Sequence, residues 1–206
     1  MTLKKIDNTA RQNILDAALQ LFADKSYEGA STREIAQRAG VTQPLLAYHF
    51  SNKDALWRAT VDMLFGKLTS VLVRRTKGLA GVDDLTTSKL LVREFIEFCA
   101  HHPQLLQIIT GECKTESDRM DWLVEKHIRP LYEATVELHE KLSKAGHLTK
   151  ISPTNFYYFL IGAGATMFAL GAECRRLTGI DPSSPEVIND HVNSVITLLF
   201  GTAAEK

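Results

Sequence analysis

A short run of residues between Thr42 and Lys53 carries side chains suited to holding a nucleic acid. In the sequence TQPLLAYHFSNK, the threonine, tyrosine, histidine and lysine can each hydrogen-bond a phosphate oxygen, and the glutamine amide can read adenine. Pro44 and Ala47 offer apolar surface for the methyl groups of thymine. These residue types at this spacing predict recognition of double-stranded DNA rather than catalysis.

A helix over residues 43–50 would sort these side chains by direction. At about 100° per residue, Leu46 and Phe50 share one face, which we expect to be buried. The opposite face and its two flanks carry the residues that we expect to meet DNA: Gln43, Pro44, Leu45, Ala47, Tyr48 and His49. This arrangement is typical of a helix that reads the major groove.

Local signals predict a second short helix in front of this one. Ser31 and Glu34 have the spacing of a capping box, in which the serine accepts from a first-turn amide and the glutamate reaches back. Gly40 suits the left-handed residue of a tight turn, and Thr42 then caps the reading helix, with Pro44 in its first turn. Two short helices joined by a few residues that include a glycine are typical of a helix-turn-helix.

Net charge gives little support to this interpretation, because the chain has 24 basic and 24 acidic residues. Residues 1–60 carry two more basic than acidic side chains. Free backbone amides can bind phosphate without a net positive charge. The helices expected to begin at Thr32, after Thr42 and at Lys53 each direct the positive end of a helix dipole outward. Arg33 and Lys53 add cations at the same places.

The rest of the chain also repeats apolar residues at intervals of three and four, so the fold class expected is all-α. The remaining helices are expected near residues 10–25, 53–77, 84–101, 103–113, 118–145, 153–177 and 185–203, which makes about nine in all. We expect two domains: a three-helix helix-turn-helix DNA-binding head over residues 1–52, and a larger helical effector-binding and dimerisation body over residues 53–206.

From Arg11 through ILDAALQLFADKSYEGASTREIAQRAGVTQPLLAYHFSNKDALW, the sequence resembles the DNA-binding head of the TetR family of bacterial transcriptional regulators. The resemblance implies phosphate contacts from Thr32, Thr42, Tyr48, His49 and Lys53. It implies that Gln43, Pro44 and Ala47 face bases. Many members have a small residue and then a tyrosine where this chain has Pro44 and Ala47, which suggests readout that relies on methyl contacts.

The resemblance further implies a homodimeric repressor that leaves an inverted-repeat operator when a small, often apolar effector binds the body. Candidate effector-binding residues are Phe95, Phe98, Cys99, His102, Ile109, Trp122, His127, Tyr132, Phe159 and Met167. For each of them, packing within the core is the alternative interpretation. In the family, the last two helices pair across a two-fold axis, and two apolar stripes of this chain fit that role: Ala163, Met167, Leu170 and Cys174, and Val192, Val195, Ile196 and Leu199.

Other classes of protein find little support in the sequence. The three cysteines are far apart and the histidines are dispersed, so we expect core thiols, no metal site and no cofactor. No apolar stretch approaches the roughly 20 residues of a membrane span, which favours a cytoplasmic protein without a membrane partner. The alternative to a regulator is a helical small-molecule-binding or catalytic protein whose head is an interaction module; Thr42, Tyr48, His49 and Lys53 favour the regulator.

Overall fold

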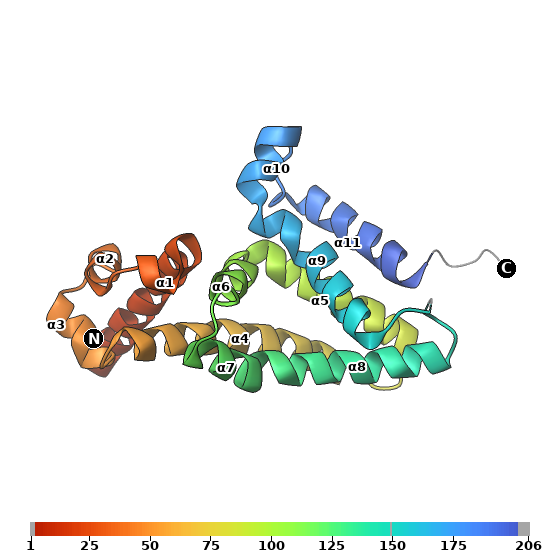
Figure 1. Ribbon diagram of the computed structural model, residues 1–206, viewed down its shortest axis with the longest axis horizontal. Helices are drawn as coiled ribbons and strands as arrows, with labels where there is room; N and C mark the ends of the chain where they lie inside the picture. Colours follow the sequence, from red (N-terminus) through yellow and green to blue (C-terminus); the bar gives the residue numbers. More distant parts are fainter. Residues whose placement is uncertain (1–2, 149, 202–206) are drawn as a thin grey trace. The chain divides into compact units, whose positions relative to one another are not determined.

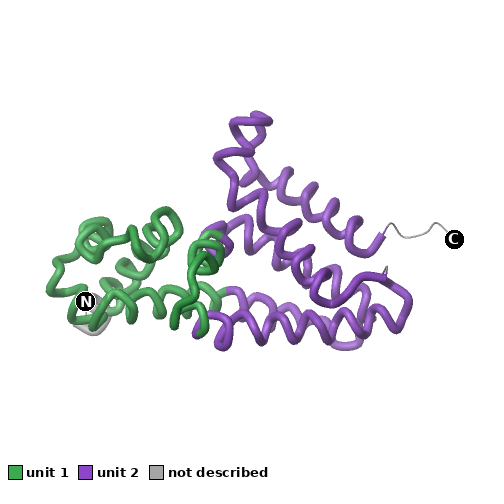
Figure 2. The backbone as a smooth tube through the Cα atoms, viewed as in Figure 1, with its two compact units in different colours: residues 1–67, 107–121 green, residues 68–106, 122–206 purple. Residues whose placement is uncertain are grey.

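The computed structural model describes residues 3–148 and 150–201, and its regular elements within these ranges are helices (Figure 1). The all-α fold expected from the apolar spacing is confirmed. The chain divides into two compact units (Figure 2). Unit 1 comprises residues 1–67 and 107–121, and unit 2 comprises residues 68–106 and 122–206.

Unit 1 is built on three N-terminal helices and the first part of a fourth. These are α1 (Leu3–Gly29), α2 (Thr32–Arg38), α3 (Gln43–His49) and α4 (Lys53–Lys77), the last with the bounds expected. The first helix was expected near residues 10–25, and α1 is interrupted at Ser26, whose φ is 60°. Side chains from all four helices form the core of the unit: Ile14, Phe22, Ile35, Leu46 and Trp57. Most of α6 (Gln104–Glu112) and the start of α7 (Asp118–Leu123) also belong to unit 1.

Unit 2 is a layered helical body around α5 (Asp84–His101). This helix packs against α8 (Arg129–Lys144), α9 (Pro153–Ala169) and α11 (Pro185–Phe200). A Cβ atom on Gly164 would lie 3.2 Å from both Phe95 and Ile96, so the small residue lets α9 approach α5 closely. Arg93 on α5 also donates to Asn189 and Asn193 of α11, at 3.1 and 3.0 Å.

The single helix expected over residues 118–145 contains a π-helical turn, Val124–Ile128, between α7 and α8. Pro130 follows this turn and lacks the N–H that an α-helix would direct at the carbonyl four residues earlier. The Arg129 amide instead donates to Val124 O, five residues back, which is the pattern of a π-turn. The missing N–H of Pro130 therefore explains why the backbone hydrogen bonds change from the α-helical to the π-helical pattern here.

The single helix expected over residues 153–177 is wrong, because the chain bends by 70° between α9 and α10 (Gly171–Thr178). Leu170 leaves the helical region at φ −97° and ψ 23°, and a Cβ atom on Gly171 would lie 3.3 Å from Pro182. The loop that contains Pro182 thus packs against Gly171 at the bend. The spacing of apolar residues does not predict this bend. The helix expected over residues 185–203 is observed as α11, which ends at Phe200. Residues 202 and 203 lie outside the described part.

Some of the cysteines and histidines have structural roles. Cys99 is the core thiol that was expected, and burial raises its pKa to about 12, whereas Cys113 is exposed and Cys174 half-buried. Two histidines hydrogen-bond backbone carbonyl groups of other segments. Nε2 of His139 donates to Ile151 O at 3.0 Å, and Nε2 of His191 donates to Ala163 O at 2.8 Å. Within the described ranges, no group of three metal-ligating side chains is found.

The described helices were also compared with the length and hydropathy of a membrane span. No single one of them is long and apolar enough to cross a membrane. The bent pair α9 and α10 meets the criteria of length and composition when its two members are taken together.

Candidate DNA-contacting surface and ligand cavity

Helix α3 presents the faces that its sequence predicts. Leu46 and Phe50 are each 4% exposed, so the inner face is packed, whereas Tyr48 on the outer face is 75% exposed. Gln43, Pro44 and Ala47 are also exposed. The polar and small side chains proposed for base contact are therefore accessible on one side of a short, well-anchored helix.

Side-chain caps position the helix-turn-helix. Ser31 Oγ accepts from the Glu34 amide at 3.2 Å, and Thr42 Oγ1 accepts from the Leu45 amide at 3.4 Å. Gly40 between them has the expected positive φ, 66°. The second half of the predicted capping box is wrong, because the Glu34 carboxylate accepts from Lys25 Nζ at 2.6 Å instead of reaching back to Ser31.

A surface hollow of about 650 Å³ lies beside these helix ends. It is lined by residues near the N-termini of α2, α3 and α4: Glu28, Ala30, Ser31, Thr32, Gln43, Leu46, Ala47, Phe50, Ser51, Asn52 and Lys53. Four of the predicted DNA-contacting residues, Thr32, Gln43, Ala47 and Lys53, thus meet at one place. The first turns of α2, α3 and α4 contribute to this lining, and helix N-termini suit an anionic backbone.

The other predicted DNA-contacting residues flank this hollow. Tyr48 and His49 have their rings 5.2 Å apart in an edge-to-face arrangement, and His49 and Leu45 are half-buried. Thr42, Pro44 and Arg33 are exposed. The structure therefore brings the expected residues to α3 and to the helix ends next to it.

Lys53 is held at the first turn of α4 by two contacts from the end of α1. Its Nζ lies 4.4 Å from the centroid of the Tyr27 ring and donates to the Glu28 backbone carbonyl at 3.4 Å. Burial lowers the pKa of Lys53 and raises that of Tyr27. These contacts therefore hold the Lys53 ammonium group in place in the absence of DNA.

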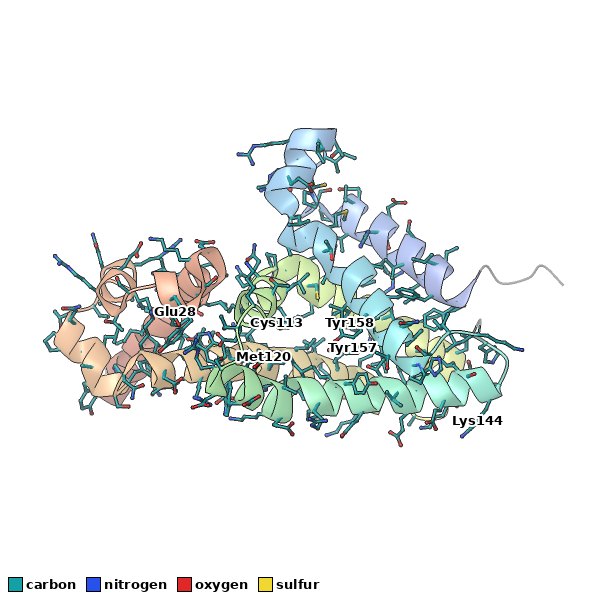
Figure 3. The ribbon with its side chains drawn as sticks, viewed as in Figure 1. Glu28, Cys113, Met120, Lys144, Tyr157 and Tyr158 are labelled. Atoms are coloured by element: carbon teal, nitrogen blue, oxygen red, sulfur yellow. The ribbon has the colours of Figure 1, made fainter. Side chains whose placement is uncertain are left out.

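Arg119 joins the same group from the segment 107–121 of unit 1. Its guanidinium lies 3.6 Å from the Tyr27 ring centroid and donates to the Glu28 carboxylate at 3.3 Å; Figure 3 labels Glu28. Arg119 Nε lies 3.1 Å from Oε1 of Glu112, a carboxylate that is 4% exposed and also accepts from Ser117 Oγ at 2.6 Å. The sequence gives no signal for this group, since Arg119 and Glu28 are 91 residues apart.

Unit 2 contains an apolar cavity of about 300 Å³. Its lining comes from α4, α5, α8 and α9: Leu68, Thr69, Leu72, Val73, Thr76, Leu91, Val92, Phe95, Leu131, Ala134, Thr135, Leu138, Phe156, Tyr157, Leu160 and Ile161. Tyr157, labelled in Figure 3, has its ring 5.2 Å from that of Tyr132 on α8. The cavity is open to solvent on one side, where Thr69, Val73, Thr76 and Ala134 are exposed. Its volume is at the small end of natural ligand sites.

One of the predicted effector-binding residues, Phe95, lines this cavity. The others lie elsewhere in the fold: Phe98 and Cys99 in the core, His102 against Phe98, Trp122 against His127, Tyr132 bonded to Thr154, Phe159 at the surface, Met167 half-buried on α9 and Ile109 in unit 1. The small residues Ala134 and Thr135, between Leu131 and Leu138 on the side of α8 that lines the cavity, are the sequence feature that could have indicated a void.

The predicted interface residues divide by burial. Val192, Val195 and Leu199 are buried and serve the core of unit 2 itself, while Ala163, Met167, Cys174 and Ile196 are half-buried and Leu170 is exposed. Because α9 and α10 are bent apart, the four residues from Ala163 to Cys174 do not form one straight stripe. The large exposed apolar side chains of this region are Tyr158, Phe159, Leu170, Leu177, Ile180 and Leu198.

Sequence similarity to the known proteins described here covers up to about half of this chain, and structural similarity covers most of it. The model for bacterial regulatory proteins of the tetR family matches residues 14–60. The transcriptional activator FasR of Mycolicibacterium smegmatis is 32% identical over 99 residues, which cover 48% of this chain and 44% of FasR. The class C tetracycline repressor protein of Escherichia coli is 43% identical over 54 residues, or 26% of this chain and 25% of the repressor. Each match thus spans less than half of the relative's own length.

A solved structure shows that the likeness of fold continues beyond the head. AibR, in a crystal structure with isovaleryl coenzyme A and operator DNA, superposes with a TM-score of 0.75 over 93% of this chain and 98% of AibR. Sequence identity is 16%, so the similarity concerns the fold.

Proposed function

We propose that this chain is a regulator of the TetR family that binds DNA and regulates transcription, because residues 14–60 match the model of that family. The observation that carries the proposal is the exposed face of α3 beside a hollow surrounded by the N-termini of three helices. Phosphates on either side of the major groove would be held by amides, hydroxyls and Lys53, and bases would be met by Gln43, Pro44 and Ala47. The proposed regulator acts in the cytoplasm, where bacterial DNA is.

We further propose that the regulator is a homodimeric repressor. Two reading helices related by a two-fold axis would favour an inverted repeat whose half-sites lie about one helical turn apart. An effector bound in the cavity of unit 2 would release the operator. The exposed apolar side chains on α9, α10 and α11 support a dimer through these helices.

A gel-shift experiment with the DNA upstream of the chain's own gene tests the central proposal. We expect binding that weakens steeply as salt rises, because phosphate contacts release counterions. A scrambled fragment of equal length is the control. Absence of salt-sensitive binding up to micromolar protein would refute the regulator and favour the helical small-molecule-binding protein with an interaction module.

Replacing Lys53 is expected to weaken binding to all sequences alike. Lys53→Ala removes a phosphate contact, so the slope of log affinity against log salt should fall by about one. Lys144→Ala, at an exposed lysine of unit 2, is the matched control and should leave the slope unchanged. An unchanged slope for Lys53→Ala would place this lysine away from the phosphates.

Replacing Gln43 is expected to change specificity instead. Gln43→Ala removes the amide that can pair with adenine, which should reduce discrimination at one base pair by about 1–3 kcal/mol. The measurement is a gel shift against a set of operators that differ singly at each position. A uniform loss of affinity over the whole set would identify Gln43 as a backbone contact.

A further inference from the structure

The hollow beside α3 and α4 contains an acidic side chain as well as Lys53. Among its lining residues, all of them described by the structure, Glu28 is the only one with a negative charge and Lys53 the only one with a positive charge. The side chain of Glu28 is 82% exposed. DNA phosphates that approach Lys53 would therefore also approach this carboxylate, and like charges repel each other.

Arg119 does not line the hollow, but it pairs with this carboxylate. Its guanidinium donates to Glu28 at 3.3 Å and lies 3.6 Å from the centroid of the Tyr27 ring. The side chain of Arg119 is only 17% exposed, and its Nε lies 3.1 Å from the buried carboxylate of Glu112. The ion pair with Glu112 thus holds the guanidinium in place beside the exposed acid.

Lys53 interacts with both of these charges. Its Nζ donates to the backbone carbonyl of Glu28 and lies 4.4 Å from the centroid of the Tyr27 ring, which Arg119 also contacts. Burial is the main cause that lowers the pKa of Lys53, while the charge of Glu28 raises this pKa and the charge of Arg119 lowers it. A Glu28 carboxylate without Arg119 could therefore pair with the ammonium group of Lys53 instead.

We propose that Arg119 is a positioning residue for DNA binding, which holds the Glu28 carboxylate and so keeps Lys53 available to a phosphate. Without Arg119, the acid would repel phosphates and compete with them for the ammonium group. This effect of charge is distinct from the support that the Tyr27 ring and the Glu28 backbone give to Lys53. The inference rests on the proposed function for the DNA contact, but the state of Lys53 can be measured on the full chain alone.

The gel shift with the upstream DNA tests the proposal in variants that circular dichroism shows to be folded. Arg119→Gln should weaken binding about three- to tenfold at low salt, as expected for one unpaired charge a few ångströms from a phosphate. Adding Glu28→Gln should then recover at least about threefold in affinity, because no acid remains in the lining. The double variant still has Glu112 buried without a cation, so urea unfolding should show no recovery of stability.

Two comparisons separate this effect from a general change in charge. Glu28→Gln alone should raise affinity less than it does in Arg119→Gln, because Arg119 already neutralises the acid. Glu116→Gln, at an exposed glutamate of residues 107–121 outside the lining, is the matched control and should recover nothing in Arg119→Gln. An equal effect of Glu28→Gln with and without Arg119, or an equal recovery from Glu116→Gln, would overturn the proposal.

A second background keeps the test decisive if Arg119→Gln does not fold. Glu112→Gln combined with Arg119→Gln removes both members of the buried ion pair, so the Glu112 side chain no longer carries a charge. In this background Glu28 still lacks its cation, and adding Glu28→Gln should again recover at least about threefold in affinity. No recovery there would contradict the proposal.

Nuclear magnetic resonance of isotope-labelled lysine side chains gives a test without DNA. The pKa of Lys53 should rise in Arg119→Gln, because a repelling cation is lost and the Glu28 carboxylate is released. The rise should be smaller when Glu28→Gln is added. An equal pKa of Lys53 in these two variants would overturn the proposal, whereas absence of DNA binding by the wild type would refute the proposed function.

Discussion

Leu198→Glu is expected to leave a folded monomer that no longer holds operator DNA specifically. Leu198 is 72% exposed near the C-terminal end of α11. A contact between the rings of Phe156 and Phe200, 6.3 Å apart, brings this end of α11 beside the start of α9, where Tyr158 and Phe159 are also exposed. A homodimer through these helices would bury about 2,000 Å² or more of largely apolar surface.

The expected effect is large because an unpaired carboxylate would be buried in that interface. The cost of such a charge, about 3–5 kcal/mol, corresponds to a dimer dissociation constant at least about 100-fold higher. A single head would then contact one half-site and lose most of its specific affinity. Analytical ultracentrifugation and the gel shift measure the two consequences.

The choice of Leu198 depends on the structure. Its neighbour Leu199 belongs to the stripe expected at the interface, yet it is 6% exposed and packs in the core of unit 2. An acid at Leu199 would therefore disturb the fold of the protomer and give an ambiguous result. Val82→Glu, an equivalent change at an exposed apolar residue in the loop between α4 and α5, is the control and should remain dimeric. A wild-type chain that is monomeric at micromolar concentration, or a Leu198→Glu dimer that still binds DNA, would refute this interface.

The head could be predicted from sequence because its determinants are local. The serine at position 31 caps an amide three residues ahead, Thr42 does the same for α3, and Gly40 supplies the positive φ between them. Each of these interactions spans at most four residues, so residue type and spacing suffice. The part of the capping box that failed, the glutamate of α2, was diverted to Lys25 by a tertiary contact.

The helices of the body could be predicted from the sequence, but the bend between α9 and α10 and the cavity could not. The apolar pattern continues through Leu170, and the chain bends there where Gly171 meets Pro182 from a later loop. A cavity is a place where side chains fail to fill space, which depends on four helices at once. Of the residues expected to line it, Phe95 does so and the others lie elsewhere; Phe156 and Tyr157 line it instead, together with aliphatic residues and threonines.

The group formed by Arg119, Tyr27, Glu28 and Glu112 links sequence segments that no local pattern connects. Replacing the arginine should destabilise unit 1 strongly. Glu112 is 4% exposed, and Arg119→Gln would leave its buried carboxylate with the hydroxyl of Ser117 and without a cation. Removing one partner of a buried ion pair costs about 3–5 kcal/mol. Operator affinity should fall as well, because the Tyr27 ring and the Glu28 carbonyl that hold Lys53 would lose their support.

Urea unfolding of variants at one protein concentration measures the loss of stability. Arg129→Gln is the matched control: Arg129 is paired with Glu125 one turn away on an exposed surface, and its loss should cost about 0.5 kcal/mol or less. The double variant Glu112→Gln and Arg119→Gln has no buried charge, so it should be more stable than Arg119→Gln alone. Hydrogen exchange should locate the increased opening of the single variant in residues 107–121. Equal losses for Arg119→Gln and Arg129→Gln would show that the Glu112 pair contributes no more than a surface ion pair, and would remove this group as the support for Lys53.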